Sequence, residues 1–386
     1  MIGEFGALMI SKIIETVSSF LPFILVLTVI VFIHEMGHFL IARYNNVHVT
    51  TFSIGYGPEI FGWTDKKGTR WCFRWIPLGG YVMMLGDADA SSVRSNFEGL
   101  DEEALSKTLP SKTPLQRTAV AFGGPLMNII FTLLIFIFIG LWKGIPDTIP
   151  KIKDVAENSI AAKCGLQGGD LITGLNDEKI EVFSEMKNFL EKNAGKDVIL
   201  HYKRGNEECT TKISLYTQDS SGEKIPAKII GIHLAGDLIF TKASVWQTIS
   251  LGIQYCYVIA ISMVSGLTKA LFGKKDGAKL GGILSIGDFA NQSMSSGLVT
   301  FLNFMAMLSF SLAIFNLLPI PVLDGGSIVI NLLEFIRRKP LSATTINFIY
   351  SGGLFIVIGL MIWATWNDLV NYGIVKKIIV FFKKLF

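Results

Sequence analysis

Charged side chains are scarce in this sequence. Asp, Glu, Lys and Arg make up only 17% of its 386 residues, whereas 50% are hydrophobic and the mean hydropathy is +0.48. Soluble proteins usually contain about 25% charged residues, so the composition excludes an ordinary soluble protein and indicates a membrane protein. The net charge of +4 is spread over loops and the C-terminal tail, without an arginine-rich face or a basic patch interleaved with aromatics. The sequence therefore gives no indication of nucleic-acid binding.

Cysteine is also sparse. The four cysteines have no CxxC spacing, which argues against a thiolate metal site or a redox pair; they are Cys72, Cys164, Cys209 and Cys256. Cys164 and Cys209 share a soluble segment, but their spacing does not establish a disulfide. A small-residue cleavage site is missing after the first apolar run, so we interpret that run as a retained membrane anchor and not as a signal peptide.

Long apolar runs, by contrast, are prominent. Four of them reach the about 20 residues that a membrane-spanning helix needs, at 19–44, 115–142, 298–320 and 343–366. Basic residues flank two of the connections, at Arg43, Lys112, Arg117 and 337–339. The positive-inside rule puts these connections in the cytoplasm, which leaves the soluble segment 149–236 outside. The four lysines of the tail 374–386 oppose this assignment, and we interpret the tail as an interfacial amphipathic helix.

The connection after the first run has a β pattern. Aromatic and aliphatic residues alternate over 52–87 on both sides of the turn-forming tetrad 65–68, DKKG, which predicts a hairpin in contact with lipid. Residues 88–114 are polar and acidic and predict an exposed loop with a short helix.

The soluble segment 149–236 predicts an independent α/β or mostly-β domain, with a helix at 184–193 and a strand at 198–204. Its string IAAKCGLQGGDLITGLNDEKI (160–180) resembles the PDZ pattern of bacterial envelope proteases. PDZ domains bind extended peptides by adding a strand to a sheet edge. By this resemblance, the domain is expected to capture peptide termini or unfolded segments.

Two histidines and a glutamate interrupt the first apolar run, in VFIHEMGHFL (31–40). Helical residues four apart share a face, so His34 and His38 can direct ring nitrogens at one metal ion, with Glu35 beside them. This is the H-E-x-x-H spacing of zinc proteases, in which zinc activates a water and the glutamate acts as general base. The alternative is a chance pattern whose histidines only satisfy hydrogen bonds. Membrane depth argues against it, because each ionisable residue there costs roughly 2.5 kcal/mol or more.

Zinc needs a third protein ligand, and the best candidate is Asp324 in FNLLPIPVLDGGS (315–327). Pro319 and Pro321 interrupt helical hydrogen bonding, and broken backbone at membrane depth indicates a buried polar cavity. The two glycines after Asp324 allow close approach of the backbone. Alternatively, Asp324 only caps the next helix.

The order of the runs constrains this site. His34 and Asp324 each lie toward the C-terminal end of a run, so the two runs must point in the same direction to bring them to one depth. One crossing between them, 115–142, satisfies this condition. We therefore predict that a further apolar stretch, 245–272, is an interfacial or re-entrant helix and not a span.

Two other segments are predicted to position the substrate. The motif FGGPLMN (122–128) has small residues that permit tight helix contact and Asn128, which needs a buried partner; a role in packing alone is equally open. Gly79 and Gly80 expose the backbone of the strand 78–85, whose edge is predicted to hold an unwound substrate by β-augmentation. The alternative is a hairpin that only anchors the fold.

Together these features resemble the site-2 protease family of intramembrane zinc metalloproteases, most closely its bacterial regulator of sigma E protease branch. The resemblance is carried by HEMGH, the hairpin, FGGPLMN, GLQGGDLI and NLLPIPVLDGG, in this order over nearly the whole chain. It implies a multi-pass protein of the bacterial inner membrane that cleaves single-span membrane proteins, such as a tethered anti-sigma factor or a signal-peptide remnant. It implies zinc ligands His34, His38 and Asp324, the base Glu35, and substrate-holding residues Asn316, Pro319 and Pro321.

The chain departs from this branch in two respects. Members usually carry two PDZ modules, whereas the exported segment here has room for one. Many have an asparagine five residues before Asn316, where this sequence has Ser311, so a substrate hydrogen bond at that position is in question.

We therefore expect an α-helical membrane protein with four transmembrane helices, a membrane-associated β-hairpin and one extracytoplasmic PDZ-like domain. Its expected regions are a first catalytic membrane region (1–144), the PDZ-like domain (145–238), an interfacial or re-entrant helix and loop (239–297) and a second catalytic membrane region (298–386). The main alternative is a non-catalytic PDZ-bearing scaffold with a structural metal site. A structural zinc site is usually closed by four protein ligands and needs no base, so Glu35 favours the enzyme.

Overall fold

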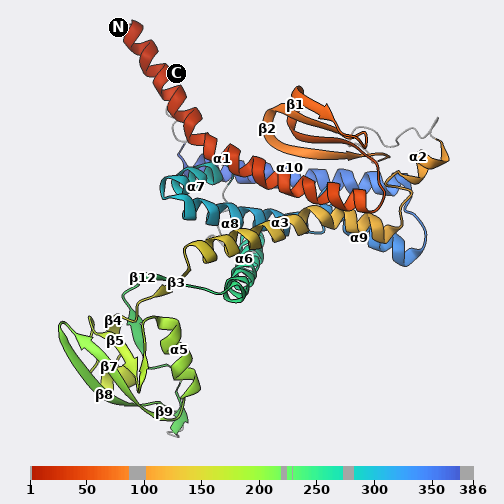
Figure 1. Ribbon diagram of the computed structural model, residues 1–386. Helices are drawn as coiled ribbons and strands as arrows, with labels where there is room; N and C mark the ends of the chain where they lie inside the picture. The colour runs from red at the N-terminus through yellow and green to blue at the C-terminus, as the bar shows by residue number, and fades with distance from the viewer. Residues whose placement is uncertain (1, 87–100, 219–223, 228, 273–281, 374–386) are drawn as a thin grey trace. The chain divides into compact units, whose positions relative to one another are not determined.

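The computed structural model describes residues 2–86, 101–218, 224–227, 229–272 and 282–373 (Figure 1). These residues form two compact units. The helical unit consists of Met1–Phe138 and Ile249–Phe386, and the β unit is Ile139–Thr248. The predicted amphipathic tail and much of the predicted acidic loop lie outside the described residues.

Long helices and one hairpin make up the helical unit. Its elements are α1 (Ile2–Tyr44), β1 (Val49–Thr64), β2 (Arg70–Met84), α2 (Glu102–Ser106), α3 (Pro114–Trp142), α6 (Val245–Phe272), α7 (Ile283–Ser295), α8 (Leu298–Asn316), α9 (Asp324–Arg337) and α10 (Ala343–Asn371). The ends of α3 and α6 extend into the β unit.

Five helices in the described part of the chain are long and apolar enough to cross a membrane: Phe20–Tyr44, Pro114–Trp142, Val245–Gly266, Leu298–Asn316 and Thr344–Asn371. The predicted number of four is therefore not confirmed. The additional helix is α6, which is one continuous helix and has no break at which the chain could turn back. Whether this helix crosses the membrane, lies at its surface or belongs to a re-entrant segment is tested by nothing in the fold, so the interfacial or re-entrant form stays a prediction.

The third predicted run ends earlier than expected. Helix α8 stops at Asn316 and not at residue 320. Pro319 and Pro321 cannot donate to the helix, so the chain turns between α8 and α9 instead.

Helix α3 contacts both α1 and α8 and runs antiparallel to each of them. At the α1 contact, a Cβ added to Gly37 would lie 2.1 Å from the Gly123 carbonyl oxygen, so the two backbones touch. At the α8 contact, the Thr132 hydroxyl donates to the Ala306 carbonyl (3.1 Å) and the Ser309 hydroxyl to the Asn128 carbonyl (3.2 Å). Because both partners are antiparallel to α3, α1 and α8 point in the same direction, as the order of the runs requires.

The predicted hairpin forms, but its strands fold back on themselves. Residues 49–54 of β1 pair with 70–73 and also with 80–84 of β2, and 59–64 of β1 pair with the other side of 70–74. The result is a small sheet in the order 59–64, 70–74, 49–54, 80–84. Segment 80–84 is an edge, and β2 packs against α1.

The hairpin turn is fastened to the end of α1. Arg43 donates to the Asp65 carboxylate at 2.6 Å, and the Trp71 ring N–H donates to the same oxygen at 3.1 Å. Burial raises the pKa of Asp65, but hydrogen bonds from Trp71, Thr69 and Arg43 outweigh it and hold the pKa well below its ordinary value. The ionised carboxylate therefore fixes the hairpin beside the helix that carries both histidines.

The β unit has its own core. Its elements are β3 (Ile145–Thr148), β4 (Ile152–Val155), α4 (Ile160–Lys163), β5 (Leu171–Leu175), β6 (Glu178–Lys179), α5 (Phe183–Lys192), β7 (Asp197–Arg204), β8 (Glu207–Ser214), β9 (Tyr216–Gln218), β10 (Lys224–Pro226), β11 (Ile232–Leu234) and β12 (Leu238–Thr241). A four-stranded antiparallel sheet has the order β6-β5-β7-β8. The predicted helix and strand correspond to α5 and β7, and Cys164 and Cys209 are not joined.

Candidate metal centre

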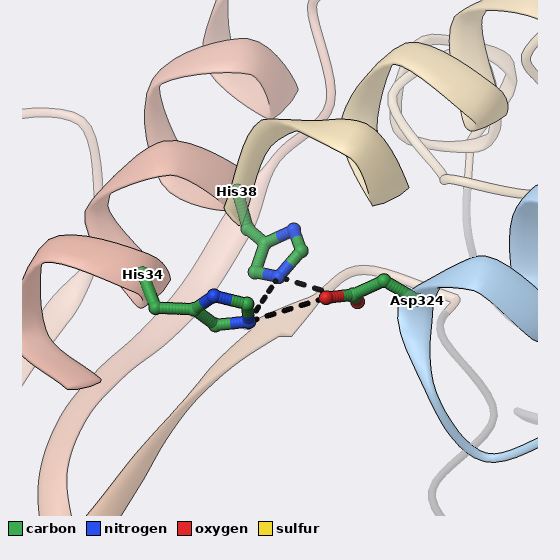
Figure 2. A group of neighbouring side chains, drawn as sticks. All are labelled: His34, His38 and Asp324. Carbon is green, nitrogen blue, oxygen red and sulfur yellow. Dashed lines mark hydrogen bonds and ion pairs between the residues drawn. The ribbon is translucent and has the colours of Figure 1, made fainter. Parts of the chain in front are cut away.

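Three side chains from distant parts of the sequence converge in the helical unit. His34 and His38 project from one face of α1, and Asp324 is the first residue of α9 (Figure 2). Their ligand atoms all lie within 4.8 Å of one another. The structure thus brings together the three residues that the sequence predicts as metal ligands.

The spacing of these atoms fits a tetrahedral ion. His34 Nε2 lies 3.2 Å from His38 Nε2 and 3.2 Å from Asp324 Oδ2, and His38 Nε2 lies 3.4 Å from Asp324 Oδ1. A tetrahedral zinc with ligand bonds of about 2.0–2.1 Å separates its ligand atoms by about 3.3 Å. Moreover, Asp324 Oδ2 is buried and has no hydrogen-bond partner among the described residues, as expected of an oxygen that serves a cation.

Groups behind the two imidazoles set their tautomers. His38 Nδ1 lies 2.8 Å from the Val120 carbonyl, which can only accept, so Nδ1 carries the proton and Nε2 offers its lone pair. His34 Nδ1 lies 3.3 Å from the side-chain amide nitrogen of Asn128, whose amide oxygen is buried without a hydrogen-bond partner among the described residues. A metal on His34 Nε2 requires a proton on Nδ1, and turning the Asn128 amide over exchanges its nitrogen for the oxygen that accepts this proton.

Glycine leaves room for the ion. A Cβ on Gly124 of α3 would lie 2.4 Å from His38 Nε2 and 2.7 Å from His34 Nε2. Such an atom would fill the space that the two lone pairs face. The motif FGGPLMN therefore contributes an empty position to the site, a role beyond the tight helix contact expected from its small residues.

A strained turn presents Asp324. Val322 has φ +86°, which is unfavourable for a β-branched residue. A Cβ on Gly325 would lie 2.3 Å from the Leu318 carbonyl oxygen, so the first turn of α9 is pressed against the end of α8. Leu323 occupies the cap position and makes no side-chain cap bond. The alternative that Asp324 caps a later helix is thus wrong, because its side chain faces the histidines.

Glu35 lies beside the three ligands and under the sheet edge. Its carboxylate accepts a hydrogen bond from the Val82 backbone N–H and interacts with the charges of His34, His38 and Asp324. A Cβ on Gly80 would lie 3.5 Å from Glu35 Cγ and 2.6 Å from the Ser53 carbonyl oxygen, so this glycine permits the close fit. The hairpin and α1 thus contact each other at Glu35, the proposed general base.

The other predicted site residues divide between the centre and its surroundings. Asn316 reaches the centre, with its amide nitrogen 3.4 Å from His34 Nε2. Pro319 is exposed in the turn. Pro321 packs tightly against α10, since a Cβ on Gly353 would lie 2.2 Å from the Pro321 carbonyl oxygen and 2.5 Å from the Pro321 Cβ. Gly79 has φ +116° and lies against Tyr56.

Comparison with known proteins agrees with this centre. The family model of peptidase family M50 matches residues 22–360. The chain belongs to peptidase family M50. Its relatives include provisionally named zinc metalloproteases of Agrobacterium fabrum (34% identity; 90% of this chain and 94% of the relative), Brucella suis (35%; 92% and 95%) and Campylobacter jejuni (31%; 91% and 93%). This M50 chain is therefore a zinc-dependent protease, and the family predicted from its motifs is confirmed.

Part of the M50 chain is also similar to solved PDZ domains. One, from an SdrC-like protein of Listeria monocytogenes, is 28% identical, covers 23% of this chain and 88% of that chain, and has a TM-score of 0.19. A similarity this low does not establish the fold of the β unit. Its PDZ-like character stays a prediction from the sequence.

The sequence did not reveal which backbone groups contact the site residues of this M50 chain. The Val120 carbonyl and the Val82 N–H contact His38 and Glu35, yet any residue type supplies these groups. Gly124 left a visible signal, since two adjacent glycines precede a proline in α3, but its function depends on how α3 crosses α1.

Proposed function

We propose that this M50 peptidase cleaves single-span membrane proteins within or near the bilayer. The observation that supports this most is the position of the centre, since both histidines and the base lie in a helix long and apolar enough to span the membrane. A soluble substrate would have little access to it. The test is to incubate the purified protein with a single-span substrate and to locate the cut by mass spectrometry. We expect a cut within or beside the apolar segment, and cleavage confined to soluble parts would contradict the proposal.

In this proposal His34, His38 and Asp324 hold the zinc. When bound, zinc supplies Lewis acidity that activates water and polarises the scissile carbonyl. The Glu35 carboxylate accepts the proton of the attacking water and delivers it to the leaving amine. The amide of Asn316, at the edge of the centre, is suited to hold the substrate carbonyl, and Pro319 and Pro321 shape the turn that presents Asp324.

Asn128 is assigned a different role from the predicted one. Its amide stands behind His34, on the side away from Asp324, so we propose that it orients the imidazole and does not touch the substrate.

Replacing Asn128 with alanine is expected to weaken zinc binding about 10- to 100-fold, the usual loss when a partner of a metal-bound histidine is removed. Asn128→Asp should retain most of the affinity, because a carboxylate also accepts from Nδ1. Competition with a chromophoric chelator measures both variants. Equal affinity in wild type and Asn128→Ala would leave Asn128 a packing residue.

The sheet edge 80–84 is proposed to hold the unwound substrate. A helical substrate must expose its carbonyls before hydrolysis, and an unpaired strand edge can accept it by β-augmentation. In the present structure two side chains cover the edge: Glu35 accepts from the Val82 N–H, and the Tyr56 hydroxyl donates to the Gly80 carbonyl at 3.1 Å. An entering substrate would take over these two backbone groups and leave the Glu35 carboxylate free for proton transfer.

Val82→Pro tests this arrangement, since proline removes the edge N–H. We expect at least about a tenfold loss of membrane-substrate cleavage with zinc retained, whereas Val82→Ala keeps the N–H and should stay near wild type. Cleavage rates and zinc content are measured on the same preparations. If both variants cleave equally, the hairpin only anchors the fold.

Residues 145–238 are proposed to form one extracytoplasmic PDZ-like domain that captures peptide termini or unfolded segments, and the protein is proposed to lie in a bacterial inner membrane. The distribution of Lys and Arg supports this orientation. The parallel direction of α1 and α8 supports an interfacial α6, since a single further crossing would reverse α8. Cysteine labelling from each side of sealed vesicles would test the orientation.

A further inference from the structure

A basic pocket of about 590 Å³ lies in the helical unit, and none of its lining residues is a proposed metal ligand. It is formed by the start of α3, the end of α9 and the turn before α10. Its lining residues include Arg117, Glu334, Phe335, Ile336, Arg338 and Lys339. Its volume is within the range of small-ligand sites.

The charges of the pocket are unbalanced. Among its lining side chains three are cationic and one, Glu334, is anionic. Glu334 is 4% exposed and already saturated: it accepts from Arg117 at 2.7 Å and from the Leu341 backbone N–H at 2.8 Å. The exposed side chains of Arg338 and Lys339 form no ion pair with any other described residue, so the pocket keeps an excess of positive charge.

The guanidinium group of Arg117 also favours the binding of an anion in this pocket. The buried Nε of Arg117 has no hydrogen-bond partner among the described residues, so Glu334 does not saturate the group. Phosphate oxygens are preferred acceptors for guanidinium groups. Because the Arg117–Glu334 pair joins residues 217 positions apart, it fixes one wall of the pocket.

The pocket lies where membrane helices begin. One candidate span starts at Pro114 and another at Thr344, and the lining residues belong to or stand next to these two starts. Headgroups lie at this level of a bilayer. Phe335 is 50% exposed and Ile336 74% exposed beside the cationic residues, which is the mixture that an interfacial lipid meets.

We propose that this pocket binds the phosphodiester headgroup of an anionic phospholipid. Arg338 and Lys339 pair with the phosphate, and Phe335 and Ile336 contact the glycerol and the upper acyl chain. Basic pockets between helices at a membrane surface are suited to this class of lipid. The site is independent of proteolysis, so its test does not depend on the catalytic proposal.

The test measures lipid binding to the full-length protein in neutral detergent by native mass spectrometry. Phosphatidylglycerol and phosphatidylcholine with the same acyl chains are titrated separately, and inorganic phosphate is added as a competitor. We expect phosphatidylglycerol to bind at least about tenfold more tightly than phosphatidylcholine. Each basic residue near an anionic lipid surface contributes about fivefold to binding, so removing two should weaken binding about 25-fold.

The variant is Arg338→Asn with Lys339→Gln. Arg338 has φ +54° at the end of α9, and asparagine tolerates that conformation, so the variant keeps the helix end. The matched control is Lys66→Gln with Lys67→Gln, which removes the same charge from the exposed hairpin turn beside the end of α1. We expect the control to retain the preference for phosphatidylglycerol.

Three results would overturn the proposal. They are equal binding of the two lipids by wild type, an equal loss in the pocket variant and the control, and full displacement of phosphatidylglycerol by inorganic phosphate at millimolar concentration. The last would mean that the pocket takes free phosphate and not a lipid. Thermal unfolding without lipid verifies that both variants are folded.

Discussion

Glu35→Gln is expected to lower the rate of peptide-bond cleavage by at least about a hundredfold, because a general base contributes roughly 10²- to 10⁴-fold. Glutamine has nearly the same shape as glutamate and still accepts the Val82 N–H bond through its amide oxygen. It cannot take a proton from water. The measurement is the cleavage rate of a single-span substrate in detergent by purified wild type and variant, normalised to zinc content.

Zinc content separates the two functions considered for this chain. If the chain is an enzyme with Glu35 as its base, the Glu35→Gln variant should lose cleavage activity but keep its zinc, since Glu35 is not among the three converging ligands. If the variant cleaves as fast as wild type, the proposed base is wrong. If wild type holds zinc but cleaves no substrate tested, the chain behaves as a scaffold with a structural metal site.

Gly124→Ala is expected to remove most of the bound zinc and, with it, the activity. The added Cβ would lie 2.4 Å from His38 Nε2, a separation that the structure can relieve only by displacing an imidazole or the helix. We expect at least about a tenfold loss of zinc affinity, as for other disturbances that misplace a metal ligand. Chelator competition and cleavage rate are the two measurements.

Gly352→Ala is the matched control. Gly352 is also helical, in α10, and a Cβ there meets nothing within 4 Å. Alanine favours helix over glycine, so this variant should keep both zinc and activity. If Gly124→Ala retains zinc as well as Gly352→Ala does, the space between the imidazoles is not where the ion is held.

The chemistry of the site could be predicted because it depends on residue type and spacing. Histidines four apart in a helix define a face, and an aspartate beside two prolines in an apolar run signals a polar cavity. The hairpin was visible from its alternation and its turn. These patterns are local in the sequence, so they can be recognised without knowledge of the tertiary structure.

The remaining parts depend on contacts between distant segments. The role of Gly124 follows from the crossing of α3 and α1, and Asn128 could be recognised as needing a partner but not assigned to His34. The fold-back of the hairpin, which makes 80–84 an edge, is not specified by alternation alone. For helix α6, local sequence is also insufficient. Its length and apolar composition suit a membrane span, whereas the shared direction of α1 and α8 argues against a crossing by α6.

Zinc retention by Asp324→Ala tests the proposed centre most directly. Wild type and variant are dialysed against a chelator and analysed for metal, with Asp177→Ala, an exposed turn residue, as the control. The proposed ligand set predicts about one zinc per chain in wild type and control and far less in Asp324→Ala. A full complement of zinc in Asp324→Ala would show that the metal is held elsewhere and would contradict the proposed centre.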